Sequence, residues 1–348
     1  MSFRQVMLAV VKALGGFALA TRLTTRGLQI ICYHGISLRD EHCFQPKLFM
    51  QEDTFRERIT YLKRNGYQVL SLDEALSHLY QETLPPRALV ITFDDGWLGI
   101  GTKAAPLLRK YGFHSTLYVT TKDVLSQTPV FDVALRYLLW KKQDETIDLR
   151  FIGLDPETIL LTSPDEIERA ACRVSDISKS WDDHNRQALL LKLAEISDVE
   201  WNSDGSNPLF RLMTLEQLAK LPSKGMDLQL HTHRHRLPID DPECVENEII
   251  NNREVLKRIV SGPFEHFCYP NGEFHPSQFP WLKKLGIKSA TTCLSGFNYP
   301  NTERFALRRF LDGEHITQVE FEAELSGFLE LLRKLRRVLQ GRQNNELP

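Results

Sequence analysis

Helical segments that end in glycine alternate with short strand-like runs along most of the chain. Four times an amphipathic segment ends in glycine and a β-favouring run begins within a few residues, after Gly66, Gly112, Gly225 and Gly286. Because glycine readily adopts the left-handed conformation that ends a helix, each of these sites predicts a helix followed by a strand. Further strands are expected within residues 28–33, 88–93 and 264–269.

This alternation predicts a parallel sheet covered by helices, either a Rossmann-like sheet or a (β/α) barrel. No Gly-x-Gly-x-x-Gly pattern follows an early strand, which favours the barrel. The expected barrel comprises residues 28–120 and 214–317. Between them, residues 121–213 are far longer than an ordinary connection and contain helical spacing. We expect a helical insertion there, which serves either as a packing decoration or as a lid or partner surface.

Both ends of the chain combine apolar residues with basic ones. Residues 1–27 predict an N-terminal helix, since the apolar run from Val6 to Ala20 is interrupted by Lys12 and is short for a membrane span. A secretory signal ending at Ala20 is the alternative. Residues 318–348 predict an amphipathic helix with an apolar stripe and a basic face, packed on the domain or in contact with a membrane or an anionic partner. The stripe consists of Leu325, Phe328, Leu332, Leu335 and Leu339, and the basic face of Arg333, Lys334, Arg336 and Arg337.

Composition mainly excludes classes. With 42% hydrophobic and 25% charged residues, the chain is ordinary globular protein and is not disordered, collagenous or embedded in a membrane. Its 43 Lys and Arg nearly balance 45 Asp and Glu, so no overall field indicates nucleic acid as a partner. Six cysteines form no Cys-x-x-Cys pair and favour free thiols in a reducing compartment. We expect a cytoplasmic protein, or one peripheral to the inner membrane, with export as the alternative.

Two adjacent carboxylates give the sharpest chemical signal. The apolar run Val90–Phe93 leads directly into Asp94, Asp95 and a glycine, which places both acids at the carboxyl end of a parallel strand. Ligands bind at this rim in α/β folds. Because successive side chains of a strand diverge, one carboxylate can face a metal while its neighbour faces a substrate. The alternative is an Asx turn that leads into a helix.

Histidines follow another predicted strand. If that strand ends at Leu230 and a turn of helix follows, His231 and His235 lie on one face and can share a cation. His231 with His233 is a competing pair, and a hydrated polar loop is a third interpretation. A further strand breaks at Pro270-Asn271-Gly272, where backbone N–H groups could stabilise an oxyanion or simply close a turn. His34 ends the first strand and would share the rim of a closed barrel.

Together these residues resemble the polysaccharide deacetylases of the NodB-homology type, carbohydrate esterase family four, over roughly residues 34–310 without the insertion. The resemblance implies a distorted (β/α)7-type barrel that removes N-acetyl groups from amino sugars of a cell-surface polysaccharide or its precursor. It also implies that Asp94 is the general base and that Asp95, His231 and His235 bind a divalent metal. Two imidazoles and a carboxylate suit Zn²⁺, although Co²⁺, Ni²⁺ or Fe²⁺ would also fit.

The chain departs from the family pattern at two places. Cys268 stands where many members carry the arginine that orients the base, and Arg308 or Arg309 could replace it. The late histidine block that supplies the general acid has no clear match, so His34 is the candidate acid. Trp97, Tyr269 and Asn271 are candidates for contact with an N-acetylated glycan. Rival interpretations are a deacylase or amidase acting on another C–N bond and a non-catalytic glycan-binding scaffold.

Overall fold

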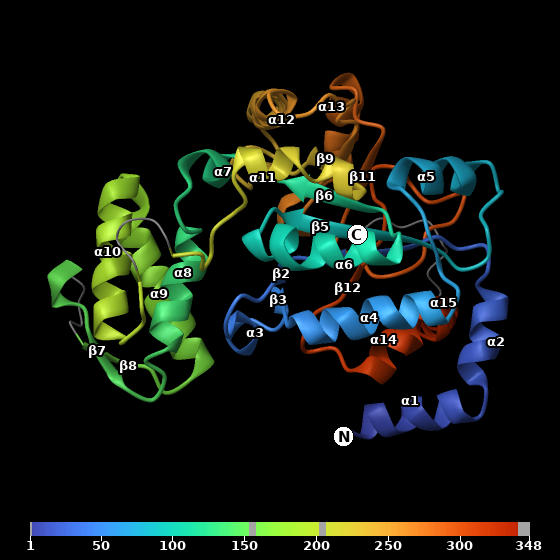
Figure 1. Cartoon of the computed structure of the whole chain (residues 1–348), viewed down its shortest axis with the longest axis horizontal. Helices are drawn as coiled ribbons and strands as arrows, with labels where there is room; N and C mark the ends of the chain where they lie inside the picture. Colours follow the sequence, from blue (N-terminus) through green and yellow to red (C-terminus); the bar gives the residue numbers. More distant parts are fainter. Residues whose placement is uncertain (1, 153–157, 202–206, 340–348) are drawn as a thin grey trace.

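A curled parallel sheet forms the centre of the molecule (Figure 1). The computed structural model describes residues 2–152, 158–201 and 207–339. Seven strands follow one another in the order β11-β10-β9-β6-β5-β1-β12, and the short β4 lies beside β5. The strands are β1 (Gln29–Tyr33), β4 (Gln68–Val69), β5 (Ala88–Asp95), β6 (Ser115–Val119), β9 (Met226–Leu230), β10 (His266–Cys268), β11 (Ser289–Thr291) and β12 (Phe310–Leu311).

The two ends of this sheet meet. The segment that leads into β12 bridges β11 in parallel at Leu307 and Thr291, and the Leu307 N–H donates to the Ala290 carbonyl at 2.9 Å. Every residue of β1, β5 and β6 is buried, as expected for strands covered on both faces. The predicted distorted (β/α)7-type barrel is therefore confirmed, and its carboxyl rim gathers the residues that follow β1, β5, β9 and β10.

Helices surround the sheet, and the predicted glycine junctions are confirmed. Gly66, Gly112, Gly225 and Gly286 all have left-handed backbone, with φ between 69° and 81°. The surrounding helices are α4 (Glu52–Arg64), α5 (Leu72–Tyr80), α6 (Ala105–Tyr111), α11 (Leu215–Ala219), α12 (Pro242–Lys257) and α13 (Phe279–Lys284). Near the rim, β2 (Gly35–Ile36) pairs with β3 (Phe49–Met50), and α3 (Glu41–Phe44) lies between them in the sequence.

The expected insertion forms a lobe beside the barrel, on the left of Figure 1. Its described residues form α7 (Lys122–Ser126), α8 (Phe131–Trp140), α9 (Pro164–Ile177) and α10 (Asp183–Ile196). They also form an antiparallel hairpin of β7 (Thr146–Asp148) and β8 (Thr158–Leu160), so the insertion is not purely helical. Backbone hydrogen bonds from Leu98 to Arg211 and from Met213 to Gly96 attach the end of the insertion to the turn after β5.

Each end of the chain carries two helices where one was expected. The N-terminal pair is α1 (Phe3–Ala13) and α2 (Gly16–Leu23), and the C-terminal pair is α14 (Gln318–Leu325) and α15 (Phe328–Leu339). The C-terminal break falls at Gly327, whose φ is 78° and where a side chain would collide with Thr24. The predicted apolar stripe packs only in part within α15, because Phe328 contacts the terminal core whereas Leu332, Leu335 and Leu339 are exposed. Residues 340–348 of the predicted helix lie outside the described residues.

Candidate active site

The carboxyl end of β5 presents Asp94 and Asp95 at the rim. Both carboxylates are almost fully buried. Left-handed backbone at Asp95, with φ 72°, and at Gly96, with φ 110°, turns the chain sharply at this point. The indole N–H of Trp97 donates to Oδ2 of Asp95 at 2.7 Å. This hydrogen bond fixes one oxygen of Asp95 and leaves the other, Oδ1, facing the histidines.

The histidines lie on an irregular loop after β9, and the expected turn of helix is wrong. Thr232 and His235 have left-handed backbone, with φ 66° and 53°, and residues 231–235 contain no helix. The Arg236 N–H donates to the Thr232 hydroxyl at 3.2 Å, which closes the loop on itself. Backbone turns, rather than helical spacing, therefore bring His231 and His235 to the same side.

Asp95, His231 and His235 converge on one point. Nε2 of His231 lies 3.4 Å and Nε2 of His235 lies 3.5 Å from Oδ1 of Asp95. The donor atoms of all three lie within 4.8 Å of one another. Ligand atoms about 2.1 Å from a tetrahedral zinc ion stand roughly 3.4 Å apart, so these separations fit a shared ion. The group can hold a divalent metal.

Hydrogen bonds behind His231 fix which ring nitrogen faces the carboxylate. Nδ1 donates to the Cys268 carbonyl at 2.8 Å, so in the neutral ring Nε2 carries a lone pair. That lone pair points at Oδ1 of Asp95, which is also an acceptor, and a cation between them satisfies both. The backbone N–H of His231 donates to Asn252, whose amide in turn donates to the Val119 carbonyl at 2.9 Å. Asn252 is fully buried on α12, and a buried asparagine within a predicted helix is the one signal in the sequence that could have indicated this role.

The alternative pair of His231 with His233 does not form here. Nδ1 of His233 lies 2.9 Å from the Thr121 hydroxyl, and this hydrogen bond ties the ring to the start of the insertion. Among the described residues, the donor group with two imidazoles is Asp95, His231 and His235.

Arg309 holds Asp94 from behind. Its NH1 and NH2 donate to Oδ1 and Oδ2 of Asp94 at 2.7 and 2.8 Å, and both side chains are buried. Burial alone raises the pKa of Asp94, but the Arg309 charge and these hydrogen bonds outweigh it and hold the pKa well below its usual range. Of the two expected substitutes for the missing arginine, Arg309 takes the position, while the Arg308 guanidinium turns to the Ser295 carbonyl.

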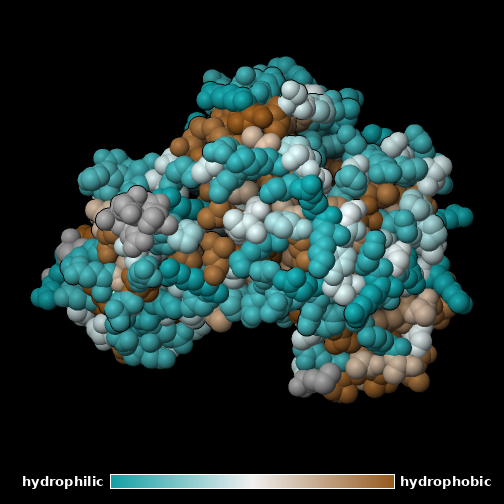
Figure 2. Space-filling view, in the orientation of Figure 1, coloured by the Kyte–Doolittle hydropathy of each residue, from teal (hydrophilic) through white to brown (hydrophobic). Residues whose placement is uncertain are grey.

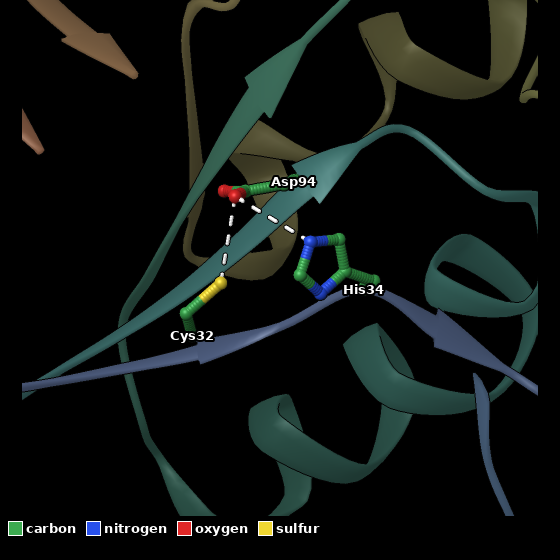
Figure 3. Close-up of side chains that lie close together, drawn as sticks. All are labelled: Cys32, His34 and Asp94. Carbon is green, nitrogen blue, oxygen red and sulfur yellow. Dashed lines mark hydrogen bonds and ion pairs between the residues drawn. The ribbon is translucent and has the colours of Figure 1, made fainter. Parts of the chain in front are cut away.

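Two thiols and an imidazole complete the surroundings of Asp94. The sulfurs of Cys32 and Cys268 each lie 3.4 Å from Oδ2, and Nε2 of His34 lies 3.8 Å from the same oxygen (Figure 3). Burial raises the pKa of the Cys32 thiol, which stays protonated and donates. Because a neutral thiol is a poor metal ligand and Arg309 already occupies Asp94, the described residues favour the group around Asp95 as the metal site. Nothing in the sequence had marked Cys32 as part of the site.

The three predicted substrate contacts are placed differently from one another. Trp97 is buried and packs on Phe49, with ring centroids 5.1 Å apart. Tyr269 is also buried, and its hydroxyl donates to the Phe305 carbonyl at 3.0 Å. Neither ring offers a free face to a sugar in this structure. Asn271 is exposed, at the tip of the turn after β10.

A cavity of about 510 Å³ opens between the histidine loop and that turn. It is lined by His235 and Asn271, together with Arg236, Asp241 and Glu273. Leu237, Pro238, Cys244 and Pro270 complete the lining, so the cavity combines polar groups that can bind hydroxyls with apolar surface. The cavity thus borders the metal-binding group directly.

Comparison with known proteins places this arrangement in a family. The family model described as polysaccharide deacetylase matches residues 81–290. A putative polysaccharide deacetylase of Bacillus subtilis is 34% identical over 98 residues, which cover 28% of this chain and 33% of that protein. A poly-beta-1,6-N-acetyl-D-glucosamine N-deacetylase of Escherichia coli is 31% identical over 272 residues, covering 78% of this chain and 34% of the relative. The chain thus matches about a third of the length of these curated relatives.

Solved structures show the same fold. The Streptococcus pyogenes deacetylase PplD in complex with acetate superposes with a TM-score of 0.56 at 18% identity, over 87% of this chain and 97% of that chain. IcaB from Ammonifex degensii superposes with a TM-score of 0.53 at 16% identity, over 86% of this chain and 96% of that chain.

Proposed function

Because the chain belongs to the polysaccharide deacetylase family, we propose that it removes N-acetyl groups from amino sugars of a cell-surface polysaccharide or its precursor. One observation carries the proposal. The metal-binding group of Asp95, His231 and His235 lies beside a buried carboxylate, Asp94, that is clamped by Arg309. This arrangement supplies a site for a Lewis acid and a fixed proton acceptor at one rim.

We assign the ion as zinc, which suits two imidazoles and one carboxylate. When bound, such an ion lowers the pKa of a water molecule towards ~7 and polarises an acetyl carbonyl. Asp95 is positioned for it by Trp97, and His231 by the Cys268 carbonyl.

Asp94 accepts the proton of the attacking water. Its low pKa keeps it ionised across the neutral range, and the double hydrogen bond from Arg309 prevents the carboxylate from rotating. As the water oxygen bonds to the acetyl carbon, the developing oxyanion requires a donor. In the turn after β10, the N–H groups of Gly272 and Glu273 already bond to carbonyls of the turn, so we assign this role to the N–H of Asn271.

His34 supplies the second proton. Its imidazole is partly exposed and lies 3.8 Å from Oδ2 of Asp94. As the C–N bond breaks, the protonated ring delivers a proton to the leaving amine, and the products are acetate and a free amino sugar.

Release of acetate tests the proposal. The purified chain should release acetate from β-1,6-linked N-acetylglucosamine oligomers or another defined N-acetylated glycan, and a chelator should stop the reaction until Zn²⁺ is restored. Asp94→Asn should lower kcat about 10²–10⁴-fold while the metal content stays at the wild-type level. An unchanged kcat in this variant would remove Asp94 from the role of base.

The rivals predict other outcomes on the same substrates. A deacylase or amidase specific for another C–N bond would leave the glycans intact and would hydrolyse small-molecule amides. A non-catalytic scaffold would bind the glycan without acetate release, metal present or not. We further propose that the chain acts in the cytoplasm or at the inner membrane, with export as the alternative, and cell fractionation distinguishes these locations.

A further inference from the structure

The terminal helices pack together into one layer on the outside of the barrel. α1 contacts α2 and α14, and α15 contacts α2 and α14. Leu8, Phe17 and Ala323 form the buried centre of this layer, with Val319 and Phe328 packed against them. One side of each helix is therefore covered, and the other side faces outward.

The outward side is unusually apolar. Phe3, Leu14, Val338 and Leu339 are 83%, 82%, 74% and 78% exposed. Most large exposed hydrophobic side chains among the described residues lie in these helices, the others here being Val6, Met7, Val10, Leu19, Leu23, Leu332 and Leu335. In Figure 2 the lower right of the molecule, where α1 lies in Figure 1, is largely brown. Apolar surface concentrated in this way marks an interaction site.

The exposed charges of α1, α2 and α15 are positive. Within the described residues of α1, α2 and α15 the one carboxylate is Glu330, which is buried and pairs with Arg333. On α14, Glu320 pairs with Arg4, and Glu322 pairs with Lys12. Exposed cations remain on α2, on the segment after it and on α15, namely Arg22, Arg26 and Arg336.

We propose that α1, α2 and α15 bind the surface of a membrane that contains anionic lipids. Helices with exposed Leu and Phe beside Lys and Arg insert their apolar side chains at the boundary between headgroups and acyl chains, while their cations contact anionic headgroups. A second copy of this chain is a poorer occupant, because a symmetric contact would place cations opposite cations without carboxylates between them.

The helices suit contact with the surface. No single described helix has the length and apolar composition to cross a membrane, and α1 with α2 meets that test only as a pair bent by 77°.

Vesicle sedimentation tests the proposal independently of any enzymatic activity. The full chain is mixed with phosphatidylcholine vesicles that contain or lack phosphatidylglycerol. We expect at least about tenfold stronger binding to the anionic vesicles, weakened by 0.5 M salt. Absence of binding to anionic vesicles would overturn the proposal.

Paired substitutions locate the contact. Phe3→Ser with Leu14→Ser should weaken binding roughly tenfold or more, since each removes an inserted apolar side chain. Leu125→Ser with Leu160→Ser is the matched control, because these side chains are also exposed but lie in the insertion. Arg22→Gln with Arg26→Gln should remove the preference for anionic vesicles. Thermal melting confirms that each variant is folded, so unchanged binding by the Phe3 and Leu14 variant would exclude this surface. If light scattering showed a dimer of the wild-type chain and a monomer of the Phe3 and Leu14 variant, the surface would instead bind a second copy of this chain.

Discussion

Two groups of aspartate and histidine side chains lie at opposite ends of strands in the same barrel. They differ in whether their polar atoms already have hydrogen-bonding partners within the protein. At the amino end of β10, His266 contacts the Ser289 hydroxyl through Nδ1 at 2.8 Å and Asp73 through Nε2 at 3.0 Å. Both ring nitrogens therefore have a hydrogen-bonding partner within the protein. This group is complete as it stands.

At the carboxyl rim the partners do not complete each other. Nε2 of His231 and Nε2 of His235 both face the same oxygen of Asp95 at 3.4 and 3.5 Å, while Nδ1 of His231 is already used by a carbonyl. Both separations are long for hydrogen bonds, whereas a cation about 2.1 Å from each atom would bridge all three. The two groups contain the same residue types. They differ in that both ring nitrogens of His266 have partners, whereas Nε2 of His231 and Nε2 of His235 face one shared oxygen.

The largest expected difference concerns metal content. His231→Ala removes one of the three proposed ligands and should leave close to no metal per chain by elemental analysis, with activity reduced at least about 10³-fold. His266→Ala is a matched control, because this histidine is equally buried and sits on the neighbouring strand. It should retain the wild-type metal content. If both variants kept or both lost the metal, the distinction between the two groups would be wrong.

A smaller effect should follow from Arg309. In Arg309→Met the largest influence that opposes burial is gone, so the pKa of Asp94 rises from its lowered value. The base then becomes protonated as pH falls through this higher value, and the acid limb of kcat/KM moves to higher pH. At neutral pH we expect roughly 10–100-fold lower kcat/KM.

Arg308→Met is the control for this shift, since Arg308 bonds to the Ser295 carbonyl and not to Asp94. Its pH profile should match that of the wild type. Arg309→Lys should recover part of the activity because it restores a positive charge without the double hydrogen bond. An acid limb that stays in place in Arg309→Met, with metal retained, would contradict the role of Arg309.

The smallest effect is expected for the group of Asp73 and His266. Asp73→Asn weakens a hydrogen bond at a partly exposed site and should lower the free energy of unfolding by about 0.5–1 kcal/mol in urea titrations, with kcat unchanged. The His266 hydrogen bond lowers the pKa of Asp73 in the folded state. The stabilisation that this hydrogen bond gives is therefore fully present above the pKa that Asp73 has in the unfolded chain. It is lost as pH falls through the pKa that Asp73 has in the folded protein. Loss of turnover in this variant would link the amino end of the barrel to catalysis.

Much of the fold can be predicted from local pattern. Gly112 and Gly225 mark the ends of helical segments, and the apolar run before Asp94 is a central strand, because backbone preference and burial act on neighbouring residues. The meeting of Asp95 with His231 and His235 was also predictable, since parallel strands present their carboxyl ends at one rim.

The failures all involve distant contacts or backbone turns. Arg309 lies 215 residues from Asp94 in the sequence, and no periodicity connects them. The sequence therefore predicts only that Arg308 or Arg309 replaces the missing arginine. The i,i+4 spacing of His231 and His235 predicts a turn of helix, but left-handed backbone at Thr232 and His235 brings the two rings together without one. Trp97 looked like a sugar-stacking ring, but burial against Phe49 depends on tertiary packing that an aromatic residue in a sequence does not reveal.

The left-handed residue Thr232 has a consequence for how the cofactor is retained. A β-branched residue rarely adopts this backbone and does so here only because the surrounding barrel imposes it. The histidine loop is thus held in one conformation by its own backbone, so binding of an ion should require little further ordering of the imidazoles. Ion retention and barrel stability are then linked, and a destabilising substitution far from the rim should appear first as faster loss of the ion to a chelator.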